Sequence, residues 1–214
     1  MNSLLEAIEH YKQNAGKRIP DEVRAIMAKA TEELKASDKG KGLKVGEQAP
    51  DFSLPDATGK EVQLSSLVKK GPVVLTFYRG AWCPYCNLEL QAYQQVLEEL
   101  HQAGAELVAI SPQSPNKSLT TKEKNELSFY VLSDVGGEVA QKYNLLFTLP
   151  DYLIDVYKTF QLNVDQYNGD QSWNLPVPAT FIIDRDQTIR YAYVDEDYTK
   201  RAEPKEVLEK VKQL

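Results

Sequence analysis

Apolar residues recur at helical spacing in two segments near the start of the chain, which predicts helices at 3–13 and 21–36. The residues that share a face are Leu4, Ile8 and Tyr11 in the first segment and Val23, Ile26, Met27, Ala30 and Leu34 in the second. A glycine-rich stretch, 37–46, predicts a linker. We therefore expect a helical extension with its linker at 1–43, followed by a main domain at 44–214. Helices of this kind cannot bury their apolar faces alone, so they should pack on the main domain or on a second copy of the chain. On this basis we predict a homodimer through residues 3–36.

The main domain alternates apolar strands with helices. The continuous apolar run at 73–78 predicts a central strand, and it is followed by a helix at 84–103 and a strand at 106–110. A strand–helix–strand unit of this kind makes the two strands parallel. The remaining predicted elements are a hairpin from 50–56 and 59–64, a weak strand at 129–132, a short helix at 137–143, a hairpin from 180–183 and 189–194, and a helix at 204–214. The segment 145–176 fits this pattern poorly and is interpreted as an insertion with a helix at 149–160. These elements predict an α/β fold.

Composition narrows the function classes. The 214 residues are 42% hydrophobic and carry a net charge of −6, so bulk binding to nucleic acid is not expected. No apolar stretch approaches the roughly 20 residues that span a bilayer. The start of the chain also lacks the basic and apolar blocks of a secretory signal, so the expected location is cytoplasmic, without membrane association.

The two cysteines, Cys83 and Cys86, carry the candidate chemistry. They are the only cysteines in the chain, and they lie where the predicted strand passes into the predicted helix. A thiol at a helix N-terminus meets unpaired backbone N–H groups that favour the thiolate, and Pro84 suits the first helical position. A second thiol one turn along can resolve a sulfenic acid or a mixed disulfide on the first. Cys83 is thus expected to be the more reactive thiol. Zinc is not expected, because only His10 and His101 remain as soft ligands and neither has ligand spacing.

From about Lys44 onward the chain resembles the thioredoxin fold, and within it the alkyl hydroperoxide reductase/thiol-specific antioxidant family, the peroxiredoxin-like proteins. The residues that carry the resemblance are Gly46-Glu47-Gln48-Ala49-Pro50-Asp51-Phe52, the strand before the cysteines, Ser111-Pro112, Phe181-Ile182-Ile183-Asp184, and Tyr78-Arg79-Gly80-Ala81-Trp82-Cys83-Pro84-Tyr85-Cys86. The resemblance implies a mixed central sheet flanked by helices, with no cofactor.

The active-site stretch departs from the family pattern. Peroxiredoxins have a proline and a threonine seven and three residues before the peroxidatic cysteine. If Cys86 is the peroxidatic cysteine, Arg79 stands at the proline position and Cys83 at the threonine position. If Cys83 has that role, Thr76 and Gly80 stand there. Pro178 stands where these proteins have an arginine, and it resembles the proline, usually cis, that faces the cysteine pair in thioredoxin-type reductases. Arg79 is a candidate for the missing charge. The peroxiredoxin register leaves Cys86 open as the attacking thiol.

We predict a thiol-dependent peroxidase with an antioxidant role that reduces hydrogen peroxide or organic hydroperoxides through a Cys83/Cys86 dithiol–disulfide cycle. An external dithiol such as a thioredoxin or glutathione system would reduce the disulfide. The alternatives are a thioredoxin-type protein disulfide reductase and a redox-sensing binding module. The candidate substrate-binding residues are Arg79, Trp82 and Pro178.

Several other residues are assigned structural roles. Thr76 is interpreted as a strand residue, and both histidines as surface residues. The charged residues at 196–203 are assigned to a solvated face. The aromatic residues assigned to packing are Tyr152, Tyr157, Tyr167 and Trp173.

Overall fold

The computed structural model describes residues 3–15 and 19–214, so residues 1–2 and 16–18 of the predicted N-terminal extension lie outside the described residues. Its strands are β1 (Ser53–Pro55), β2 (Glu61–Gln63), β3 (Val73–Phe77), β4 (Glu106–Ser111), β5 (Tyr130–Ser133), β6 (Leu146–Thr148), β7 (Asn174–Pro176), β8 (Ala179–Ile183) and β9 (Ile189–Val194). Its helices are α1 (Leu4–Ala15), α2 (Asp21–Ala36), α3 (Leu64–Val68), α4 (Pro84–Gln102), α5 (Pro115–Lys124), α6 (Glu138–Lys142), α7 (Asp151–Thr159), α8 (Val164–Asn168) and α9 (Pro204–Val211).

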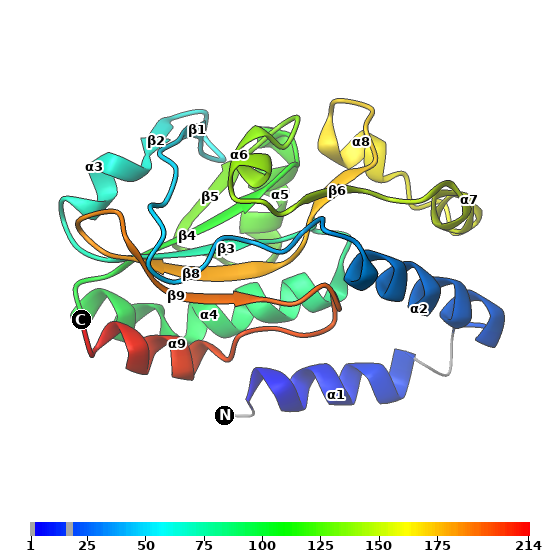
Figure 1. Cartoon of the computed structure of the whole chain (residues 1–214), viewed down its shortest axis with the longest axis horizontal. Coiled ribbons are helices and arrows are strands. Elements are labelled where there is room, and N and C mark those ends of the chain that lie inside the picture. Colours follow the sequence, from blue (N-terminus) through cyan, green and yellow to red (C-terminus); the bar gives the residue numbers. More distant parts are fainter. Residues whose placement is uncertain (1–2, 16–18) are drawn as a thin grey trace.

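The central sheet has the order β5-β4-β3-β8-β9, with β3 in the middle (Figure 1). β3 pairs in parallel with β4, as the strand–helix–strand pattern predicts, and antiparallel with β8. The sheet is therefore mixed. The central position of β3 explains why its five residues are all buried and its sequence is continuously apolar.

Successive residues of the central strands enter two separate cores, one on each face of the sheet. Leu75 and Phe77 pack with α3 and α6 on one face, whereas Val74 packs with α4 and α9 on the other. In α4 the buried positions include Leu90 and Tyr93, while Leu88, which the sequence placed inward, is half-buried. The sheet is thus covered by helices on both faces (Figure 1).

The two N-terminal helices lie against the same chain. Leu4 and Ile8 of α1 are buried, and α1 packs beside α4. The backbone N–H groups of Leu4 and Leu5 both donate to the Glu203 carboxylate, at 3.3 Å. A carboxylate at a helix N-terminus is favourable because it meets unpaired N–H groups and the positive end of the helix dipole.

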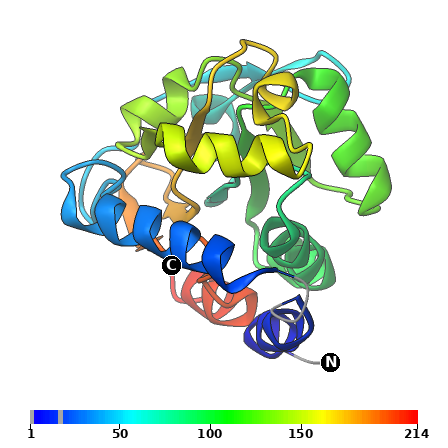
Figure 2. The ribbon, with the colours of Figure 1, turned by 90° about the vertical axis from the view of Figure 1, so that its right-hand side faces the viewer.

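Helix α2 lies beside α7 in the segment interpreted as an insertion (Figure 2). Ile26, Met27 and Ala30 pack against a small core that includes Leu153 and Tyr157. The apolar faces of both helices therefore pack on the main domain, which is the first of the two alternatives that the sequence left open. The residues of this face of α2 are only half-buried there, so the homodimer stays a prediction.

Candidate active site

The loop between β3 and α4 is held in place by a glycine and a buried glutamine. Gly80 has a φ of 150°, and a Cβ atom there would lie 2.5 Å from Nε1 of Trp82. The N–H of Ala81 donates to Oε1 of Gln113, 2.9 Å away, which is buried in the loop after β4. Only glycine combines this backbone conformation with room for the indole. The loop thereby places the Trp82 ring against Arg79 and Tyr157.

Cys83 caps the N-terminus of α4, and Pro84 occupies the first turn, as the sequence predicted. The N–H of Cys83 donates to the Gly80 carbonyl at 3.0 Å, and Nδ2 of Asn87 donates to the Ala81 carbonyl at 2.8 Å. Both cysteines are free thiols, with exposed fractions of 1% for Cys83 and 0% for Cys86. The pair is therefore a buried dithiol fixed to the start of the helix.

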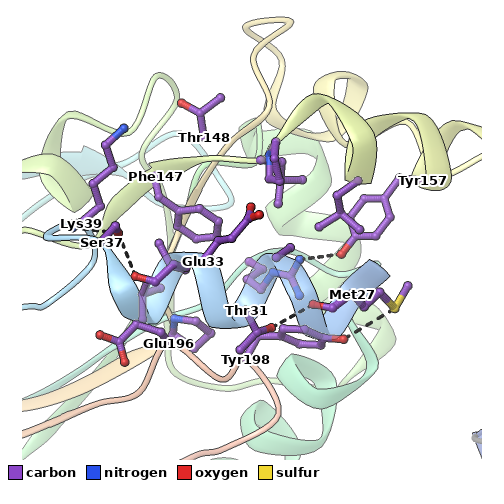
Figure 3. A pocket seen from close by; sticks show the side chains of 18 residues that line it. Met27, Thr31, Glu33, Ser37, Lys39, Phe147, Thr148, Tyr157, Glu196 and Tyr198 are labelled. Atoms are coloured by element: carbon purple, nitrogen blue, oxygen red, sulfur yellow. Dashed lines mark hydrogen bonds between the residues drawn. The ribbon is translucent and has the colours of Figure 1, made fainter. Parts of the chain in front are cut away.

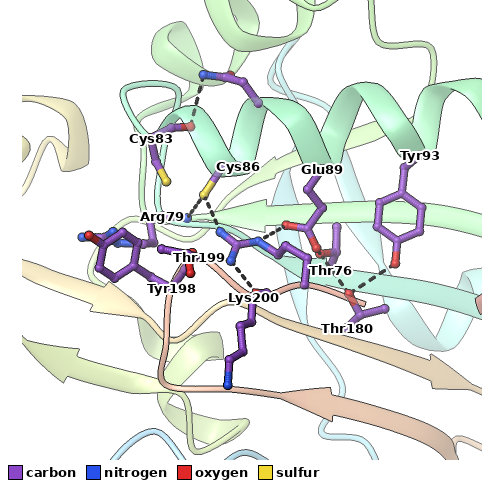
Figure 4. Close-up of polar contacts among 12 residues, drawn as sticks. Thr76, Arg79, Cys83, Cys86, Glu89, Tyr93, Thr180, Tyr198, Thr199 and Lys200 are labelled. Carbon is purple, nitrogen blue, oxygen red and sulfur yellow. Dashed lines mark hydrogen bonds and ion pairs between the residues drawn. The ribbon is translucent and has the colours of Figure 1, made fainter. Parts of the chain in front are cut away.

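The sulfur of Cys86 receives two donors (Figure 4). The backbone N–H of Arg79 lies 3.5 Å from Sγ, and Nη2 of Arg201 lies 3.3 Å from it. Burial nevertheless raises the pKa of Cys86, and the neighbouring Cys83 raises it further by hydrogen bonding and by its charge. Cys86 therefore holds its proton more strongly than an ordinary thiol.

The pKa of Cys83 is shifted in the opposite direction, below its ordinary value. Burial by itself raises the pKa of Cys83, but the hydrogen bond from Cys86 and the charges of Arg79 and Arg201 outweigh it and lower the pKa to about 6. At neutral pH, Cys83 is then the thiolate and Cys86 the thiol. This is the charge distribution of a nucleophile beside a resolving group.

Arg201 corrects one prediction from the sequence. It belongs to the charged stretch at 196–203, yet its side chain is only 2% exposed and forms an ion pair with Glu89, with Nε 2.6 Å from Oε2. Burial raises the pKa of Glu89 to about 7, although Arg201 opposes the shift. Thr76, interpreted as a strand residue only, also donates from Oγ1 to Oε1 of Glu89, at 3.4 Å. A buried ion pair thus lies directly behind Cys86.

Arg79 is enclosed by aromatic side chains. Its guanidinium carbon lies 4.7 Å from the centre of the Trp82 ring and 4.5 Å from that of Tyr198, within cation–π range. Its Nη2 donates to the hydroxyl of Tyr157, 2.9 Å away. Tyr157, assigned to packing from the sequence, therefore also fixes the orientation of Arg79.

Pro178 lies in the wall of a cavity that Arg79 also lines. The peptide bonds of the described residues, including the one before Pro178, are all trans, unlike the cis bond that the reductase resemblance implies. Arg79 thus contacts Trp82 and acts by its charge on Cys83, and it shares the cavity lining with Pro178. His10 and His101 are exposed, and among residues 3–15 and 19–214 there is no cluster of three or more side chains suited to hold a metal ion.

Three residues near the dithiol, Glu89, Tyr198 and Arg201, were not predicted as site residues. The signal for Glu89 was present, because it falls on the buried face of α4 one turn after Cys86. Arg201 is separated from Cys86 by 115 positions, so no local pattern indicates their contact. Tyr198 gave no signal either, since its role depends on how the chain returns to the site after β9.

Comparisons with known proteins indicate the family of this chain. Residues 45–192 match the model of the AhpC/TSA family. A Mycobacterium tuberculosis protein with a provisional peroxiredoxin name is 34% identical over 125 residues, which cover 58% of this chain and 81% of that protein. Peroxiredoxin Bcp of Escherichia coli is 34% identical over 103 residues, or 48% of this chain and 65% of that protein. The crystal structure of peroxidoxin BcpB from Mycobacterium tuberculosis superposes with a TM-score of 0.63 at 26% identity, covering 80% of this chain and 98% of that one.

Within the described residues, no helix has the length and apolar character needed to cross a membrane.

Proposed function

This chain belongs to the AhpC/TSA family, and from that membership we propose that it is a thiol-dependent peroxidase in which Cys83 attacks the peroxide and Cys86 resolves the product. The observation that carries the assignment is the placement of two buried guanidinium groups at the dithiol. Arg201 donates to the Cys86 sulfur, and the positive charge of Arg79 acts on Cys83. In a buried site such charges stabilise a thiolate strongly, because little water screens them.

The proposed reaction has two steps within the protein. The Cys83 thiolate attacks one peroxide oxygen, the O–O bond breaks, and the second oxygen leaves as water or an alcohol after taking up a proton. Cys83 becomes a sulfenic acid, so the thiol is oxidised and the peroxide reduced. Cys86 then attacks the Cys83 sulfur and loses its proton, and the sulfenic oxygen leaves as water when the disulfide forms. An external dithiol restores both thiols by exchange.

Each arginine has a distinct role in this scheme. Arg79 lies on the side of Cys83 and stabilises its thiolate before attack. Arg201 contacts Cys86 and is positioned to stabilise that sulfur as it loses its proton during resolution. Tyr157, Trp82 and Tyr198 hold Arg79 in place and are positioning residues.

The decisive experiment mixes the pre-reduced full chain with hydrogen peroxide in a stopped-flow instrument, with Trp82 fluorescence and thiol loss as readouts. We expect two thiols to be lost per chain, far faster than in a free cysteine of ordinary pKa. Loss at the rate of a free thiol would contradict the peroxidase assignment.

The competing function, a protein disulfide reductase, is favoured by the complete Cys-x-x-Cys pair and by Pro178. The burial of Cys83 counts against it, because a protein disulfide has to approach the attacking sulfur closely. A rate comparison between a disulfide-linked peptide and hydrogen peroxide separates the two functions. Faster consumption of the peptide by the reduced protein would favour the reductase.

The external reductant and the oligomeric state are also proposals. We propose a thioredoxin or glutathione system as reductant, which coupled assays that follow NADPH consumption can distinguish. Dependence on such a reductant suits the reducing cytoplasm. Light scattering of the full chain tests the predicted homodimer, and a monomeric mass would contradict it.

A further inference from the structure

A cavity of about 180 Å³ lies between α2 and the segment that leads into α7 (Figure 3). Helix α2 supplies Met27, Ala30 and Leu34 to one wall, and Leu149 and Leu153 form part of the opposite wall. These five side chains are apolar. Charged residues, Glu33, Lys39 and Glu196, line other parts of the cavity, so its apolar part is the part that these five side chains form.

Arg79 connects this cavity to the dithiol. It lines the cavity, its exposed fraction is only 3%, and its charge lowers the pKa of Cys83. Its Nε–H is buried and has no hydrogen-bond partner among the described residues. An unpaired buried donor is unfavourable, so a ligand that brings an oxygen acceptor to this N–H group would relieve that cost. The site thus combines an apolar wall with the guanidinium group of Arg79, whose charge acts on the reactive thiol.

The volume indicates what kind of ligand fits. A dry cavity of about 150 Å³ lined by aliphatic and aromatic side chains is large enough to bind benzene. A cavity of 180 Å³ therefore accepts a phenyl ring or a branched alkyl group of similar size. Hydrogen peroxide has no apolar group and gains nothing from these walls.

We propose that this cavity binds the apolar group of organic hydroperoxides, with the peroxide oxygens directed to Arg79, and that helix α2 is a specificity-determining element. The proposal rests on the peroxidase function proposed above. The family match begins at residue 45, whereas the wall formed by Met27, Ala30 and Leu34 precedes it. The N-terminal extension thereby adds a substrate wall from outside the segment that matches the family.

The test compares two alanines of α2 that differ in where they face. Ala30 lines the cavity and is half-buried, whereas Ala25 is exposed and lines no part of it. Ala30→Phe fills the cavity, and Ala25→Phe is the matched control. We expect Ala30→Phe to lower the ratio of kcat/KM for cumene hydroperoxide to that for hydrogen peroxide about tenfold, which is about 1.4 kcal/mol. The loss should appear mainly in KM, and Ala25→Phe should retain the wild-type ratio.

Unchanged ratios in both variants, or equal losses in both, would overturn the proposal. Ala30→Leu serves as a milder variant if the phenylalanine impairs folding, and an intermediate ratio is then expected. A wild-type ratio in a folded Ala30→Leu protein would count against the cavity as the binding site.

A binding measurement separates this proposal from the peroxidase function. Calorimetry of the reduced full chain with 2-phenylpropan-2-ol, the alcohol that cumene hydroperoxide yields, needs no turnover. We expect the wild type and Ala25→Phe to bind it and Ala30→Phe to bind at least about tenfold more weakly. Equal binding by all three proteins, or none by the wild type, would refute the site even if peroxide is consumed rapidly. Binding without peroxide consumption would refute the peroxidase function instead.

Discussion

Arg201 contacts Cys86 and Glu89 with different nitrogens of one guanidinium group. Its Nη2 lies 3.3 Å from the Cys86 sulfur, and its Nε lies 2.6 Å from Oε2 of Glu89. Because the Arg201 and Glu89 side chains are 2% and 1% exposed, solvent screens this arrangement very little. Glu89 therefore holds the cation that stabilises the buried sulfur.

Removing the cation alone should destabilise the fold strongly. Arg201→Met leaves the Glu89 carboxyl buried without its partner, and loss of one member of such a pair costs about 3–5 kcal/mol. Urea denaturation measures the change in the free energy of unfolding. The double variant Arg201→Met/Glu89→Gln should recover part of the loss, because no buried carboxyl then has to take up a proton on folding. A double variant no more stable than Arg201→Met would contradict this account.

Replacement of Cys83 and replacement of Cys86 should impair the reaction at different steps. Cys83→Ser removes the low-pKa thiol, so peroxide turnover should fall to the level of a protein without a reactive cysteine. Cys86→Ser retains the attack but not the resolution, so one sulfenic acid, over-oxidised Cys83 or a mixed disulfide should accumulate, each detectable by mass spectrometry. Near-native turnover by Cys83→Ser would contradict the assignment. Trapped intermediates in Cys83→Ser but not in Cys86→Ser would reverse it and make Cys86 the attacking thiol.

The rate of oxidation should depend on pH through Cys83. With a pKa of about 6, its thiolate is nearly complete above pH 7, so the rate constant with hydrogen peroxide should be level there. Below pH 6 the rate should fall about tenfold per pH unit, since only the thiolate reacts. Thiolate absorbance at 240 nm should show the same midpoint, and it should be absent in Cys83→Ser. A midpoint near the ordinary thiol value would contradict the structure.

The same shift affects stability. The pKa of Cys83 is lower in the folded chain than its reference value of 9.0, so ionised Cys83 contributes stability that is fully present above pH 9 and is lost as the pH falls through about 6. Comparing the unfolding free energies of wild type and Cys83→Ser between pH 5 and pH 9 tests this. The free energy of unfolding of the wild type should increase relative to that of Cys83→Ser as the pH rises. A difference between the two free energies that does not change with pH would contradict the prediction.

Alkaline pH should compensate for the loss of the Arg79 charge. Arg79→Gln removes a charge that lowers the pKa of Cys83, so the oxidation rate at pH 7 should fall about tenfold or more and recover toward wild type near pH 9. Tyr157→Phe is a suitable control, because it removes only the hydroxyl that accepts from Arg79 and leaves the charge. If Arg79→Gln is equally slow at pH 7 and pH 9, then Arg79 does not act through the charge of Cys83.

The sequence was sufficient for the parts of the fold that depend on neighbouring residues. The central strand, the helix that begins at Pro84 and the parallel pairing of β3 with β4 follow from apolar runs and from proline position. Helix α5 was missed because it is largely polar. Strands β6 and β7 were missed because each has only three residues, and their pairing lies within the segment interpreted as an insertion.

The site was predictable only in part, because only some of its residues are neighbours in the sequence. Cys83, Cys86, Arg79 and Trp82 are close in sequence, so one motif brings them together. Arg201 looks from the sequence like any charged residue of a surface loop. Its burial depends on the carboxylate of Glu89 and on the return of the chain from β9 to α9, which no local pattern specifies.

The two arginines also bear on the reduction potential of the dithiol. Arg79 and Arg201 attract sulfur that carries negative charge, and a neutral disulfide between Cys83 and Cys86 would lose that attraction. Interactions that stabilise the reduced form of a dithiol make its disulfide a stronger oxidant. The oxidised protein should consequently accept electrons readily from an external dithiol. The same charges that prepare Cys83 for attack thereby favour the return of the pair to its reduced state.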